Sequence, residues 1–149
     1  MVSWAAVGYW VWKCQFFDRQ HVIVQAQKEG KAAELVKGTG NPGYAATLYE
    51  RQPQWLKESR PLLKPLQEMP ATVICWANGS TLRGIPQGAD QIRMFHPTLY
   101  LVDEAAFIDD FEQSYGAAEA VASQIIAVSS AAPSFFGDVC TDILEQAEK

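Results

Sequence analysis

The stretch TLYLVDEAAFIDD, residues 98–110, joins an apolar run to a group of acidic residues. Residues 99–102 are apolar, which is typical of a strand buried on both faces of a parallel sheet. Asp103 and Glu104 follow directly, so two carboxylates stand at the carboxyl end of this strand, where open α/β sheets form their ligand crevice. An Asp there can hold Mg²⁺, and a neighbouring Glu can polarise water for attack on a phosphoryl group, the arrangement called Walker B. The alternative is a solvated strand end whose acids begin the next helix.

Segments with the patterns of strands and helices alternate along the chain, which predicts an α/β fold. Apolar or β-branched runs predict strands at residues 21–25, 99–102 and 124–128. Strand-like runs on both sides of Asn78-Gly79 predict a tight hairpin within residues 72–85. Because a helical segment joins the strands at 99–102 and 124–128, we expect these two strands to be adjacent and parallel.

The segments between and after these strands are expected to form helices and irregular structure. Helix formers, followed in one case by GTGNPG, predict helices at residues 28–37, 112–123 and 135–146. Residues 44–70 are rich in Pro, Gln and basic side chains, and we expect irregular structure with short helix there. A length of 149 residues with 48% hydrophobic content suits one domain, residues 1–149.

The first apolar segment, SWAAVGYWVWKCQFF at residues 3–17, has the composition of a helix buried on most sides. It is shorter than the roughly 20 apolar residues that a membrane span needs, and it lacks the leading positive charge of an export signal. We therefore expect it to lie between other elements. Trp4, Trp10 and Trp12 are then expected to pack in the core rather than to form a platform for stacking nucleic-acid bases.

Composition excludes some classes of function and weakens others. The net charge of −5 gives no general attraction to nucleic acid. The three cysteines lack the spacing of a zinc site or of a disulfide framework, which indicates a reducing compartment. Isolated His21 and His96 are expected to be structural. The basic residues of the middle segment are expected to form a solvated face rather than a DNA contact; they are Arg51, Lys57, Arg60 and Lys64.

Two hydroxyl groups follow the apolar run QIIAV at residues 124–128. If this run lies beside residues 99–102 in a parallel sheet, Ser129 and Ser130 come to the same edge as Asp103 and can sense the phosphate end of a bound nucleotide. The alternative is a Ser-rich turn that caps the following helix.

Three segments in order, NGSTLRGIP, QIRMFHPTLYLVDEAAFIDD and QIIAVSSAAPSFF, resemble the ATPase domain of phage terminase large subunits, the motors that package DNA into viral proheads. The resemblance implies an incomplete three-layer P-loop NTPase-like fold, with a mostly parallel sheet and flanking helices. It implies ATP and Mg²⁺ as cofactors. It also implies double-stranded DNA, the terminase small subunit and the portal as partners, no membrane partner, and a location in the bacterial cytoplasm.

The same resemblance implies roles for individual residues. Asp103 takes the magnesium-associated role and Glu104 the catalytic role. Ser129 and Ser130 fall on the coupling motif that links hydrolysis to motion. Ser3 falls on the position that ligates magnesium at the end of the P-loop. Arg93, on a variable helix, is expected to contact phosphate or a neighbouring subunit; the alternative is a surface salt bridge.

The chain also departs from the family pattern. Only Val2, Ser3 and Trp4 match the end of the P-loop, Met1 stands where a glycine is expected, and the basic residues of the loop are absent. Three residues cannot build a cradle of backbone N–H groups for phosphate. The last strands and the nuclease domain of the family are also missing. We therefore expect a fragment that hydrolyses ATP poorly or not at all.

Two other functions are compatible with the residues. One is a binding or assembly module, for example a homo-oligomer that covers an open sheet edge. The other is a metal-dependent nuclease built on the acids Asp103, Glu104, Asp109 and Asp110, although such sites draw carboxylates from several separated strands.

Overall fold

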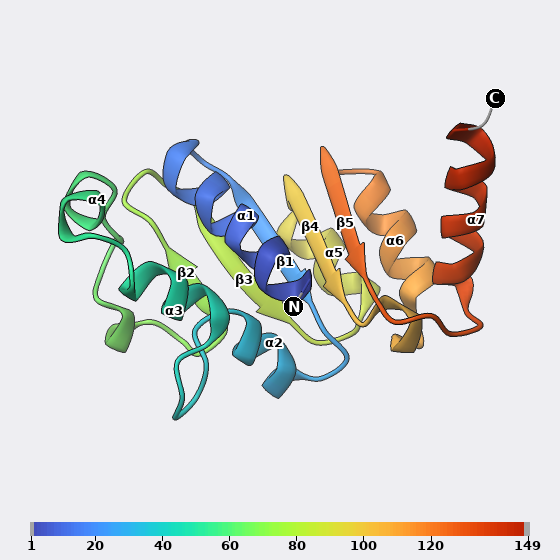
Figure 1. Cartoon of the computed structure of the whole chain (residues 1–149), viewed down its shortest axis with the longest axis horizontal. Helices are drawn as coiled ribbons and strands as arrows, with labels where there is room; N and C mark the ends of the chain where they lie inside the picture. Colours follow the sequence, from blue (N-terminus) through green and yellow to red (C-terminus); the bar gives the residue numbers. More distant parts are fainter. Residues whose placement is uncertain (1, 148–149) are drawn as a thin grey trace.

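The computed structural model describes residues 2–147, which form a five-stranded sheet with helices on both faces (Figure 1). The strand order is β2-β3-β1-β4-β5. β2 is antiparallel to β3, and the other pairs are parallel. The strands are β1 (His21–Gln25), β2 (Val73–Cys75), β3 (Thr81–Ile85), β4 (Leu99–Asp103) and β5 (Gln124–Val128). The predicted α/β class with a mostly parallel sheet is confirmed.

The described part of the chain also contains seven α-helices and two short 3₁₀ helices. The α-helices are α1 (Val2–Phe16), α2 (Glu29–Leu35), α3 (Tyr44–Glu50), α4 (Gln54–Ser59), α5 (Ala89–Phe95), α6 (Phe111–Glu119) and α7 (Phe135–Ala147). The 3₁₀ helices are η1 (Leu66–Glu68) and η2 (Ala105–Phe107). The short helices α3, α4 and η1 agree with the expectation for residues 44–70, whereas α6 ends earlier than predicted.

Alternating side chains of the central strand divide the core into two layers. Val22 and Val24 of β1 pack with the apolar residues of α1, α2 and α3, and Ile23 packs with those of α5 and α6. Figure 1 shows α1, α2 and α3 in front of the sheet and α5 and α6 behind it. Gly84 of β3 permits close packing of α2, since a Cβ there would lie 2.6 Å from the carbonyl oxygen of Ala32. The arrangement is therefore helix, sheet, helix.

The expectation that the first helix is buried on most sides is wrong. Trp10 is fully buried, but Trp4 is 38%, Trp12 is 44% and Phe16 is 41% exposed. α1 covers one face of the sheet. Within residues 2–147, no other element covers most of the side of α1 that faces away from the sheet. None of the helices in residues 2–147 has the length and apolar character that crossing a bilayer requires.

The hairpin between β2 and β3 is present, but its turn is longer than predicted. Residues 76–80 form the loop, closed by a hydrogen bond from the Trp76 N–H to the Ser80 carbonyl, and Gly79 has a φ of 84°. The Asn78 side chain donates to the carbonyl of Cys14, 2.8 Å away, and so satisfies an acceptor at the end of α1. The conformation of the loop therefore depends on its contact with α1 as well as on the residues of the turn itself.

Candidate functional site

The strands that carry the two predicted motifs lie side by side. β4 and β5 are parallel, with Leu99 opposite Gln124 and Asp103 opposite Val128. The carboxyl ends of the two strands therefore share one edge of the sheet, and Ser129 follows directly at that edge. The predicted adjacency of these strands is confirmed.

The start of α1 lies at the same edge. The hydroxyl of Ser3 donates to Oδ1 of Asp103 at 2.7 Å, although the residues are 100 positions apart in sequence. At the opposite end of the sheet, the hydroxyl of Tyr9 donates to the side chain of Gln124, the first residue of β5, 3.1 Å away. This hydrogen bond aligns α1 with β5. The sheet thus presents a carboxylate to the first turn of a 15-residue helix.

Glu104 begins a tight turn after β4. Its backbone is left-handed, with φ 56° and ψ 42°, and its side chain is exposed. Left-handed backbone costs an L-residue free energy, and such conformations gather at functional sites. The turn continues as η2, so Glu104 stands free of the ladder while Asp103 remains within β4 and is half-buried.

Side chains from two other strand ends hold this turn. The hydroxyl of Ser129 accepts a hydrogen bond from the N–H of Ala106 at 3.1 Å. Gln27, just beyond β1, donates from Nε2 to the carbonyl of Phe107 at 3.2 Å. Ser129 therefore bonds to the Asp103–Glu104 turn and not to α7. Sequence reasoning missed Gln27; its position directly after a predicted strand at the same sheet edge is the signal that points to it.

A positive charge lies near Glu104. Lys31 of α2 pairs with Glu34 at 3.3 Å on the protein surface. The pKa of Lys31 is raised above its ordinary value, first by the hydrogen bond and charge of Glu34 and to a smaller extent by the charge of Glu104. Lys31 is therefore an exposed ammonium whose charge interacts with that of Glu104.

Two other predicted site residues form no hydrogen bond with the Asp103–Glu104 turn in the described structure. Arg93 lies in the last turn of α5, on the opposite face of the sheet from α1, where it pairs with Asp90 at 3.4 Å and remains exposed. Ser130 is exposed, and within residues 2–147 its side chain makes no hydrogen bond. The nucleotide-binding role of Arg93 and the coupling role of Ser130 stay predictions.

Of the acids downstream of Glu104, Asp110 holds the start of α5. Oδ2 of Asp110 accepts the N–H of Ala89, the first residue of α5, at 3.0 Å. Asp109 is exposed. In the described part of the chain no three His, Cys, Asp or Glu side chains are grouped to hold a metal ion. The four acids proposed for a nuclease therefore do not converge.

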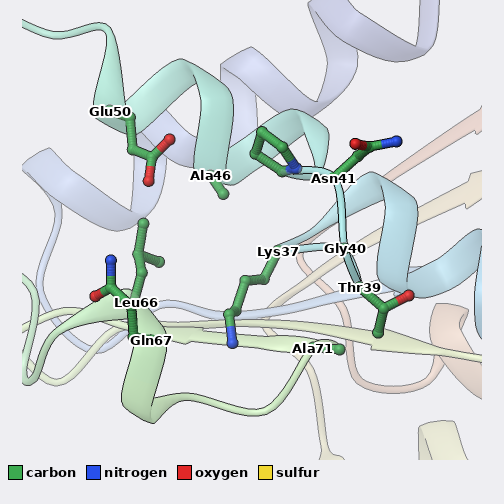
Figure 2. Close-up of a pocket in the computed structure, with 11 residues that line it drawn as sticks. Lys37, Thr39, Gly40, Asn41, Ala46, Glu50, Leu66, Gln67 and Ala71 are labelled. Atoms are coloured by element: carbon green, nitrogen blue, oxygen red, sulfur yellow. The ribbon is translucent and has the colours of Figure 1, made fainter.

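A cavity is present elsewhere in the described structure. It has a volume of about 650 Å³ and lies between the loop after α2 and η1, with Lys37, Glu50 and Gln67 on its walls (Figure 2). The ammonium of Lys37 donates to the carbonyl of Met69. Neither Ser3 nor Asp103 is among the residues that line this cavity.

No family model and no curated protein matches the chain. The fold and the site define a class: a three-layer α/β domain with a hydroxyl and two carboxylates at the carboxyl edge of parallel strands. In such folds that edge is where ligands bind.

Proposed function

We propose that this chain carries the metal-associated and water-orienting half of a nucleoside triphosphatase site, of the type that drives DNA packaging in phage terminase large subunits. The hydrogen bond between Ser3 and Asp103 is the observation that carries the proposal. In P-loop triphosphatases, a Ser or Thr at the start of the first helix and an Asp at the end of a strand share the magnesium ion. Here the same pair of groups meets from opposite ends of the sequence.

The chemistry of these groups suits Mg²⁺. Asp103 and Ser3 offer hard oxygen atoms, and Mg²⁺ is commonly held by one or two protein ligands together with substrate phosphates and water. When bound, Mg²⁺ supplies positive charge that neutralises phosphate oxygens. The first N–H groups of α1 add a preference for anions at this position.

Glu104 is proposed to orient the attacking water. Its carboxylate is outside the β4 ladder, on a turn that Ser129 and Gln27 hold from two neighbouring strands. Because Ser129 bonds directly to this turn, a movement of the end of β5 would change the position of Glu104. That contact is the physical basis for proposing Ser129 as a coupling residue.

Hydrolysis by this polypeptide is proposed to be weak. Stabilisation of phosphoryl transfer depends on a preorganised cradle of N–H groups and a cation around the phosphates. In the described structure, the first turn of α1 reaches Asp103 through Ser3 and the charge of Lys31 acts on Glu104, which is less than such a cradle supplies. The proposal also includes the partners of a terminase motor, which are double-stranded DNA, a terminase small subunit and the portal. It places the protein in the bacterial cytoplasm.

Titration of the isotope-labelled protein with MgADP, followed by nuclear magnetic resonance of backbone amides, tests the site. We expect weak binding that shifts the amides of Ser3, Asp103 and Ser129. Asp103→Asn should remove the magnesium-dependent part of the shifts, and Glu104→Gln should retain it. Asp109→Asn, an exposed acid of the same segment, is the matched control.

Two outcomes would count against the proposal. Shifts confined to the cavity near Lys37, or no shifts at millimolar MgADP, would remove the assignment of the site. Rapid ATP hydrolysis that Glu104→Gln abolishes would instead keep the site and overturn the statement that hydrolysis is weak.

A second function, self-assembly, is favoured by the open edge at β5. This strand pairs only with β4 in the described structure, carries no charged residue, and is half-buried from Ile125 to Val128. Unprotected edge strands of this kind pair with other chains. We expect a concentration-dependent dimer in analytical ultracentrifugation that Ile126→Lys weakens. A monomer at all concentrations, with wild-type and variant alike, would exclude this function.

A further inference from the structure

Three aromatic rings at the C-terminal end of α1 are exposed. Trp12 is 44%, Phe16 is 41% and Phe17 is 42% exposed, and Tyr9 lies one turn before Trp12 on the same side of the helix. Exposed aromatic residues that occur together, rather than singly, mark interaction sites.

These rings contact one another. The Tyr9 and Trp12 rings are stacked, with centroids 5.7 Å apart and an interplanar angle of 29°. Phe17 meets Trp12 edge to face at 5.1 Å, and Phe16 lies 6.5 Å from Trp12. Trp12 is therefore the centre of a continuous aromatic surface.

Two cations accompany the rings. Nζ of Lys13 lies 4.7 Å from the ring centroid of Phe17 and 5.7 Å from those of Tyr9 and Trp12. The guanidinium of Arg60, which follows α4, lies 5.3 Å from the ring of Phe16. We call these six residues the aromatic–cation cluster. The ion pairs in the described structure involve Lys31 and Arg93. Neither Lys13 nor Arg60 therefore has a carboxylate partner there.

A small cavity adjoins the cluster at Arg60. Its volume is about 180 Å³, and Arg60, Asn78 and Trp76 are among its lining residues. Nε1 of Trp76 is buried and has no hydrogen-bond partner within residues 2–147.

We propose that the aromatic–cation cluster binds single-stranded nucleic acid, with bases stacked on Trp12 and its neighbours and with Lys13 and Arg60 at the backbone phosphates. Aromatic rings interleaved with cations are the general means by which proteins hold single strands, because every base has a face that stacks. A duplex offers no such face, so it is not the ligand. The overall charge of −5 and the neighbouring Asp18 oppose binding, and the affinity depends on these local cations.

The cluster is independent of the Ser3–Asp103 site. Ser3 and Phe16 stand at opposite ends of α1, which places them about 20 Å apart at the helical rise per residue. Binding at the cluster therefore needs neither Mg²⁺ nor nucleotide, and each proposal can fail without the other.

Fluorescence anisotropy of a labelled oligothymidine about twelve nucleotides long tests the proposal, since single-strand sites cover roughly 4–16 nucleotides. The wild-type chain should bind the single strand in low salt and bind a matched duplex more weakly. Trp12→Leu should reduce the affinity about tenfold, while Trp12→Tyr, which keeps a stacking ring, should restore most of it. Lys13→Gln should weaken binding and flatten its dependence on salt.

Trp4→Ala is the control, because Trp4 is a partly exposed tryptophan of the same helix outside the cluster. Equal binding by Trp12→Leu and Trp12→Tyr would show that stacking is not involved and would overturn the proposal. Failure of the wild-type chain to bind the oligonucleotide would also overturn it. Self-association that Trp12→Leu abolishes, without oligonucleotide binding, would assign the cluster to a protein interface instead.

Discussion

At the scale of residues, the site depends on one long-range contact and one unusual backbone. Ser3 and Asp103 meet through a hydrogen bond of 2.7 Å that is partly buried. The next residue, Glu104, adopts left-handed backbone with φ 56°. Both features have consequences for stability that are separate from any activity, so they can be measured on the chain as it is.

The Ser3–Asp103 contact should appear as an interaction energy in a double-mutant cycle. Hydrogen bonds to charged groups contribute about 1.5–3 kcal/mol, and partial exposure should place this one near the lower end of that range. We expect Ser3→Ala and Asp103→Ala to be non-additive in urea unfolding. Ser130→Ala, which removes an exposed hydroxyl, should change the free energy of unfolding little. Strict additivity of the first pair would show that the contact does not form in solution.

Glu104→Gly should make the protein more stable than Glu104→Ala. Left-handed backbone costs an L-residue about 1–2 kcal/mol, and glycine adopts it without a steric penalty, although its greater entropy in the unfolded chain offsets part of the gain. Urea unfolding of the two variants measures the difference, which we expect to be near 1 kcal/mol. A less stable glycine variant would mean that the turn after β4 has another conformation.

At the scale of elements, α1 shows how an apolar helix can be exposed on one side. Its buried side chains are Ala6, Val7, Trp10, Val11, Cys14 and Gln15. Its outer side carries Trp12 and Phe16 and is as apolar as the buried side, while the Trp4 ring stacks on Tyr44 of α3. A helix that is hydrophobic all round is normally enclosed. The composition of this helix therefore predicted burial on most sides. The sheet covers only the inner side of the helix, so its outer side stays exposed.

Replacing two tryptophans of α1 should separate its two sides. Trp10 is fully buried, and Trp10→Ala should cost about 3–5 kcal/mol because it removes a large side chain from the core. Trp12→Ala removes a ring that is 44% exposed and should cost about 1 kcal/mol or less. Thermal or urea unfolding gives both values. Similar losses for the two variants would contradict the orientation of α1.

At the scale of the whole molecule, the packing of the helices on the sheet makes chemically identical side chains differ in burial. Cys14 is fully buried between α1 and the sheet, whereas Cys75 and Cys140 are half-buried. Burial raises the pKa of the Cys14 thiol far above its ordinary value, and the neighbouring Cys75 raises it further. The thiol therefore stays protonated in the folded protein across the neutral and mildly alkaline range.

Thiol titration with Ellman's reagent at pH 8 should thus distinguish the cysteines. In the Cys75→Ser, Cys140→Ser double variant we expect almost no reaction before unfolding, because the thiolate is the reactive form and the sulfur is shielded. In denaturant the same thiol should react quickly. Rapid reaction of the folded double variant would show that the layer formed by α1 opens readily.

Local patterns were sufficient for several features of the fold and of the candidate site. The apolar run of residues 99–102 predicted β4, and the run at 124–128 predicted β5 as its parallel neighbour. Asp103, Glu104 and Ser129 were placed at one sheet edge on the same argument, since strand period and the handedness of crossovers act over short stretches of chain. Their chemical roles are still predictions.

What the sequence by itself determined is therefore the class of the fold and the edge of the sheet at which the polar residues gather. Tertiary structure alone decided which groups meet there: the Ser3 hydroxyl with Asp103 and the Gln27 amide with the turn after Glu104. It also decided that Trp10 enters the core while Trp12 stays exposed. The reason is physical, because such contacts depend on how helices dock on a sheet across long separations in sequence, and no local propensity encodes that docking.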